Sequence, residues 1–73
     1  MHLELRSSID GQDARLTWSD GQLGGDDEFI RRVLRFALIV DVDIATADQA
    51  EIIRLARHAL AAPVVIAEIQ TPT

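Results

Sequence analysis

The sequence predicts an α+β fold, a two-layer sandwich in which a β-hairpin is followed by two helices and a C-terminal strand (ββααβ). Residues 2–9 and 13–19 alternate between apolar and polar side chains, as half-buried strands do. Residues 27–40 and 47–61 repeat their apolar side chains with a helical period. Residues 64–70 are rich in β-branched side chains, which favour a strand. We therefore expect a three-stranded sheet with both helices on one face.

Composition limits the class of protein. At 73 residues the chain has room for a single domain, 1–73, and its 48% hydrophobic content is too high for a disordered chain. There is no cysteine and there are only two histidines, so we expect no disulfide, no metal and no cofactor. The longest apolar run, residues 36–40, is far shorter than the ~20 residues of a membrane span. We expect a cytoplasmic protein with no membrane association.

The hairpin turn is predicted at residues 10–11, because Asp-Gly is the pair that a two-residue type I′ turn prefers. With such a turn, Leu5 pairs with Leu16, and Leu3 with Trp18 two positions further out. A four-residue loop would pair Leu5 with Trp18 and would keep the same apolar face. We favour the two-residue turn.

A second Asp-Gly turn at residues 20–21 follows the hairpin. Leu23 could fold back beside Trp18 as a short third arm, but we expect Gly24 and Gly25 to break the strand pattern. Asp26 is expected to be the N-cap of the first helix. The acids at residues 27–28 would then face the positive end of the helix dipole.

The C-terminal half of the first helix has two interpretations. We favour a continuous helix over residues 27–40, since no turn residue separates Arg35 from the apolar run that follows. The alternative is a strand over residues 36–44, where apolar residues and aspartates come to alternate. For the second helix, Thr46 and Gln49 fit a capping box as N-cap and N3 residues.

The sequence has more apolar residues than the core between one sheet and two helices can bury. The predicted core comprises Leu3, Leu5, Leu16, Trp18, Phe29, Ile30, Val33, Leu34, Leu38, Ile53, Ala56, Leu60, Val65 and Ile69. The first helix carries further apolar residues at the margin of its apolar arc, and the last strand is apolar on both faces. The candidate interface is therefore Phe36, Ile39, Val40, Val64 and Ile66.

Residues 24–29, GGDDEF, resemble the GG(D/E)EF signature of diguanylate cyclases. That resemblance implies a hairpin turn inside a nucleotide-binding domain more than twice this length. Here an extra aspartate interrupts the signature, and the residues that follow are predicted to be helical. We interpret the string as a glycine loop followed by the acidic start of a helix.

Residues 37–43 resemble the first motif of haloacid-dehalogenase-type phosphotransferases, in which one aspartate is the nucleophile and the other the acid/base. The matching residues would be Asp41 and Asp43, but Ala45 stands where the family needs threonine or valine. The chain also has no lysine and no room for the later acidic motif. Together with Asp48 these acids could gather a hard cation. We interpret them as solvated residues of the loop between the helices.

Neither histidine has a nucleophile partner in a recognisable arrangement, so we expect no enzymatic activity. The leading hypothesis is a non-catalytic protein-binding module that forms a homodimer or binds an unidentified protein. The alternative is an arginine face that binds nucleic acid or another polyanion, although the net charge of −5 argues against nucleic acid. That candidate face consists of Arg31, Arg32, Arg35, Arg54 and Arg57.

Overall fold

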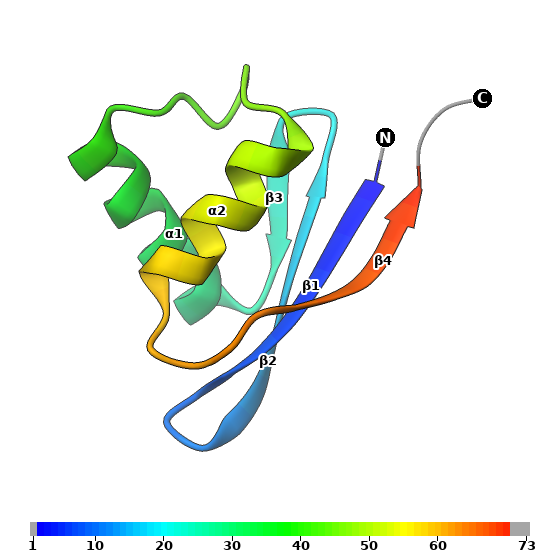
Figure 1. The fold of residues 1–73 in the computed structure, drawn as a ribbon, viewed down its shortest axis with the longest axis vertical. Helices are drawn as coiled ribbons and strands as arrows, with labels where there is room; N and C mark the ends of the chain where they lie inside the picture. Colours follow the sequence, from blue (N-terminus) through cyan, green and yellow to red (C-terminus); the bar gives the residue numbers. More distant parts are fainter. Residues whose placement is uncertain (1, 71–73) are drawn as a thin grey trace.

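The computed structural model describes residues 2–70 of the chain. Its elements, in order, are β1 (His2–Ile9), β2 (Gln12–Ser19), β3 (Gln22–Gly25), α1 (Asp27–Val40), α2 (Gln49–Ala59) and β4 (Val65–Gln70). The strands form one antiparallel sheet in the order β3-β2-β1-β4. Both helices lie on the same side of this sheet (Figure 1). The α+β class is confirmed, but the sheet has four strands rather than three.

The hairpin of β1 and β2 has the predicted register. Leu5 pairs with Leu16 and Leu3 with Trp18. Asp10 and Gly11 form the turn with φ angles of 53° and 81°, the left-handed pair that a type I′ turn requires. The four-residue loop is therefore excluded.

The fourth strand is β3, which the prediction ended too early. Gly24 and Gly25 do not break the strand but continue it, pairing with Thr17 and Leu16 of β2. Gly25 has a φ of 102°, and a side chain there would clash with the carbonyl oxygen of Arg15. Glycine at this position therefore lets the backbone of β3 lie closer to β2 than any other residue would allow.

Helix α1 is continuous to Val40, so the alternative strand over residues 36–44 is wrong. Asp41 ends the helix in the left-handed conformation, and its backbone N–H donates to the carbonyl of Ala37. Asp26 is the N-cap residue, as predicted, but its side chain does not cap the helix. Its carboxylate instead accepts a 2.7 Å hydrogen bond from the backbone N–H of Arg15, tying the start of α1 to β2.

Helix α2 starts two residues later than predicted. Its N-cap is Asp48, whose carboxylate accepts a hydrogen bond of 2.9 Å from the backbone N–H of Glu51. The carboxylate of Glu51 in turn accepts a hydrogen bond of 3.3 Å from the backbone N–H of Asp48. This capping box replaces the predicted box of Thr46 and Gln49 because aspartate is the stronger N-cap residue. The helix ends at Ala59 rather than at residue 61.

The core lies between the helices and one face of the β1–β2 hairpin. Its buried residues are Leu3, Leu5, Ala14, Leu16, Trp18, Phe29, Val33, Ala37, Ala47, Ile52, Leu55, Ala56, Leu60 and Val64. Helix α1 contributes Phe29, Val33 and Ala37, which are spaced four residues apart and form a narrow arc. The fully buried side of α1 is therefore narrow, and Ile30 and Phe36 pack against the core beside it, partly buried.

Several predicted core residues are consequently outside the core. Leu34 and Leu38 are exposed because they flank the arc of α1 that faces the sheet. Ile30 and Ile53 are only partly buried. Val65 and Ile69 are exposed as well, because they lie on β4.

Strand β4 is an edge strand, and all six of its residues are exposed. A register shift lies between Glu4 and Leu5 of β1, so that Glu4 pairs with Glu68 whereas Leu5 pairs with Ile66. Such a bulge changes the alternation of side chains along the strand. It places both Ile66 and Ile69 opposite core residues of β1, on the side of the sheet that carries the helices.

Candidate functional site

Exposed apolar side chains gather in two separate places. Leu34, Leu38, Ile39 and Val40 lie in the C-terminal half of α1, and Val65, Ile66 and Ile69 lie on β4. Helix α1 packs against β2 and β3, whereas β4 pairs with β1 at the far edge of the sheet. Figure 1 shows the two regions on opposite sides of the molecule. The predicted interface is thus divided between two surfaces.

Two of the predicted interface residues are less accessible than expected. Val64 is only 8% exposed and belongs to the core, which corrects its placement on an exposed face. Phe36 is partly buried, and its ring stacks on the imidazole of His58, with centroids 5.7 Å apart and planes inclined by 20°. Phe36 therefore helps to join α1 to α2. By contrast, Ile39 is 73% exposed.

The outer side of α1 carries a stripe of four residues: Arg31, Leu34, Leu38 and Asp41, which we call the α1 stripe. Arg31, Leu34 and Leu38 are spaced three and four residues apart along one line of the helix, and Asp41 follows as the left-handed C-cap residue at its end. Leu38, in the middle of the line, is 83% exposed, more than any other large apolar residue of the described chain. The α1 stripe thus has a cation at one end, two leucines in the middle and an anion at the other end.

The arginines of α1 do not form an uninterrupted basic face. Glu28 pairs with Arg32 at 3.0 Å and with Arg31 at 3.5 Å. The hydrogen bond from Arg32, followed by the charges of Arg31, Arg32 and Arg35, lowers the pKa of Glu28, so its carboxylate stays charged among them. On α2, Glu51 lies beside Arg54 in the hollow between the helices. Polyanion binding by the arginines stays a prediction.

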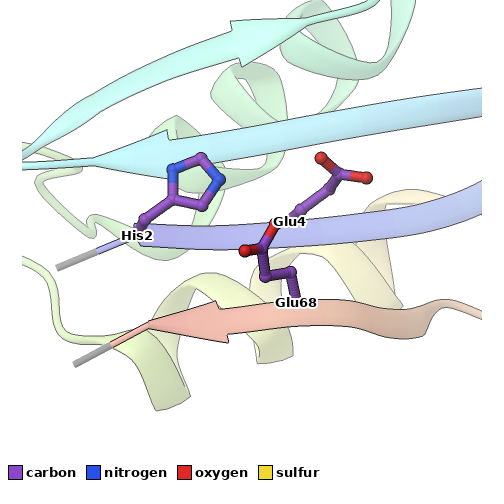
Figure 2. A group of neighbouring side chains, drawn as sticks. All are labelled: His2, Glu4 and Glu68. Carbon is purple, nitrogen blue, oxygen red and sulfur yellow. The ribbon is translucent and has the colours of Figure 1, made fainter.

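Two of the three loop aspartates that could gather a cation accept hydrogen bonds from the backbone instead. Asp43 accepts a 3.0 Å hydrogen bond from the backbone N–H of Ala45, and Asp48 caps α2. Within residues 2–70, none of these loop aspartates belongs to a group of three potential metal ligands. Such a group does exist elsewhere, on β1 and β4, and consists of His2, Glu4 and Glu68 (Figure 2). The sequence prediction missed it because its members are far apart in the chain.

The leucines of the α1 stripe were also missed, since they were assigned to the core. Spacing in the sequence does not separate them from the core: Phe29, Val33 and Ala37 are four residues apart, but so are Ile30, Leu34 and Leu38. Within residues 2–70 no helix is long and apolar enough to cross a membrane. No family model, no curated protein and no solved structure matches this chain.

Proposed function

We propose that this protein is a non-catalytic interaction module that forms a homodimer through the α1 stripe. The observation that carries the proposal is the exposure of Leu38, at 83%, on a line of residues with opposite charges at its two ends. An apolar surface framed by charged residues is typical of a protein–protein interface. Dimers with two-fold symmetry are the most common closed assemblies, so a second copy of the chain is the occupant we infer.

The order of residues in the α1 stripe suits an antiparallel pair of helices. When the two-fold axis passes level with residue 36, Leu34 of one chain faces Leu38 of the partner subunit. The same axis places Arg31 opposite Asp41 of the partner subunit, so that each end gains an ion pair. A parallel pair would instead bring arginine against arginine and aspartate against aspartate, which repel each other.

The size of this contact suggests a modest affinity. Helix α1 has 14 residues and is therefore about 21 Å long at 1.5 Å per residue. Burying one leucine side chain contributes about 1.5–3 kcal/mol, and the symmetric pair buries four of them. Association itself costs at least ~4 kcal/mol in lost translational and rotational freedom. The balance is at most about 8 kcal/mol, so we expect a dissociation constant that is micromolar at the tightest.

Disulfide trapping tests the arrangement directly, because the natural chain has no cysteine. Leu34→Cys and Leu38→Cys variants are mixed in a glutathione redox buffer, and cross-linked dimers are separated by mass. The antiparallel pair predicts that dimers with one chain of each kind exceed those formed by either variant alone. Facing residues of packed helices approach the Cα separation of about 4.4–6.8 Å that a disulfide needs.

The matched control is the same mixture made with Ile66→Cys and Ile69→Cys on β4, which should show no enrichment. Sedimentation of the natural chain provides the second measurement, with Leu38→Glu expected to shift a dimer to a monomer. A natural chain that is still monomeric at about one millimolar would exclude self-association. Enriched cross-links on β4 instead of α1 would keep the dimer but reject this interface.

A further inference from the structure

We propose that His2, Glu4 and Glu68 form an open binding site for a divalent transition-metal ion such as Zn²⁺. The site lies on the side of the sheet away from the helices and joins β1 to the edge strand β4 (Figure 2). It is independent of the homodimer proposed above, because none of its residues belongs to α1. Each chain would bind one ion.

Strand geometry brings the three side chains together. His2 and Glu4 are two residues apart on β1, so both point to the face opposite the buried Leu3 and Leu5. Glu68 is the cross-strand partner of Glu4. The potential ligand atoms of the three residues all lie within 4.8 Å of one another. A zinc ion binds nitrogen and oxygen at about 2.0–2.2 Å, so the three side chains would have to move slightly closer together to bind it.

The types of ligand favour a transition metal over Mg²⁺ or Ca²⁺. Imidazole is a good ligand for zinc, copper, iron and nickel, whereas magnesium and calcium prefer oxygen alone. Two carboxylates neutralise the charge of a divalent ion. With three protein ligands the ion keeps at least one position for water, as in open zinc sites.

A second observation points to a cation at this place. Glu4 and Glu68 are directly opposite each other across the β1–β4 pair, and like charges in that position destabilise a sheet. Only one of the two has an arginine: Arg6 Nε lies 3.1 Å from Glu4 Oε2. Glu68 receives a neutral hydrogen bond of 2.8 Å from the amide of Gln70. A divalent ion between the carboxylates would turn this repulsion into an attachment of β4 to β1.

The two acids also have outer partners that would orient them. Arg6 engages Oε2 of Glu4, and Gln70 engages Oε1 of Glu68. Within residues 2–70 the other oxygen of each carboxylate has no hydrogen-bond partner and is available to an ion. Hydrogen bonds of this kind, from an outer shell of residues, are a regular feature of metal sites in proteins.

Titration calorimetry of the untagged chain with zinc sulfate at neutral pH tests the proposal. We expect one ion per chain, and binding at least tenfold weaker in Glu68→Gln and in His2→Ala. His58→Ala is the matched control, because it removes the other histidine and should bind zinc like the natural chain.

Thermal unfolding with and without zinc distinguishes metal binding by Glu68 from a purely structural role of that residue. Without metal, Glu68→Gln should unfold at the same temperature as the natural chain or higher, because it removes the opposed charges. With zinc, the natural chain should gain stability and the variant should not. The proposal is overturned if the natural chain shows no zinc binding at a hundred micromolar, or if Glu68→Gln binds zinc as tightly as the natural chain.

Discussion

The two edge strands of the sheet, β3 and β4, differ in how they are held. Strand β3 has four residues, two of them glycines, and it lies in contact with α1 as well as with β2. Strand β4 has six residues, and each of them is exposed. Its side chains nevertheless include three large apolar residues, Val65, Ile66 and Ile69. Strand β3 is therefore packed against a helix as well as a strand, whereas the main contacts of β4 are with β1.

The two edges thus differ in exposure: β3 is partly buried, whereas every residue of β4 is exposed. The short length of β3 and its contact with α1 are features that disfavour pairing with another chain. No such protection covers β4, and the metal site that we propose would provide an attachment by other means. We therefore expect substitutions near β3 to affect stability strongly, and those on β4 to affect it weakly.

The largest effect is expected where α1 packs against the sheet. Phe29 is fully buried at the start of α1, and Phe29→Ala should lower the free energy of unfolding by about 3–5 kcal/mol. Ile69→Ala on β4 should cost less than about 1 kcal/mol, because that side chain is already half exposed. Urea denaturation of both variants measures the contrast. Equal losses would mean that β4 is as tightly packed as the covered edge.

A smaller but still large effect is expected at the glycine that joins β3 to β2. Gly25→Ala must both adopt a φ of 102° and displace the carbonyl of Arg15, so we expect a loss of about 2–4 kcal/mol. Gly11→Ala is the control, since its φ is also positive, at 81°, but nothing lies within 4 Å of the added carbon. Its loss should be about 1 kcal/mol. If chemical denaturation gives the same loss for both, the close approach of β3 has no energetic importance.

The smallest effect concerns pH and the helix that covers β3. The arginines around Glu28 lower its pKa, so its charged form stabilises the folded chain above the ordinary pKa of a carboxylate. That contribution disappears as the pH falls through the lowered pKa of the folded state. Glu28→Gln should therefore slightly lower the melting temperature at neutral pH, and this effect should vanish as the pH falls through the lowered pKa of Glu28.

The matched variant for this measurement is Asp27→Asn. Asp27 is in the same first turn of α1 and faces the same helix dipole. A difference between the two variants thus reports the contacts of Glu28 with the arginines. Because Glu28 is exposed, the effect should also shrink at high salt, and one that persists there would contradict an ion-pair origin.

Local patterns in the sequence were sufficient for part of the fold. The Asp-Gly turn at residues 10–11 and the alternation of its flanking strands predicted every pair of the β1–β2 hairpin. The lack of a turn residue after Arg35 predicted the continuous helix α1. The start of α2 was misplaced because two overlapping capping boxes fit the sequence, and the stronger N-cap preference of Asp48 over Thr46 was not weighed. Strand β3 was missed because glycine was interpreted as a break, whereas here it permits close pairing.

For the candidate interface, the sequence predicted that some apolar residues would be exposed, but not correctly which ones. Ile39 and Val40 are exposed as expected, whereas Val64 is buried and Leu34 and Leu38 replace it on the surface. Periodicity alone cannot show how wide an arc of α1 the sheet covers, because that depends on how the helix is rotated against its neighbours. The group of His2, Glu4 and Glu68 depends on the strand order, which no local pattern contains.

What the sequence by itself determined about this protein is local: the register of the hairpin, the extent of the first helix and the α+β class. These features depend on interactions between residues close in the chain, such as turn geometry, side-chain alternation and helical period. The tertiary structure decided which apolar residues are left exposed and that β4 lies beside β1. It alone brought Glu68 next to His2 and Glu4, because pairing between the two ends of a chain is set by packing rather than by local preference.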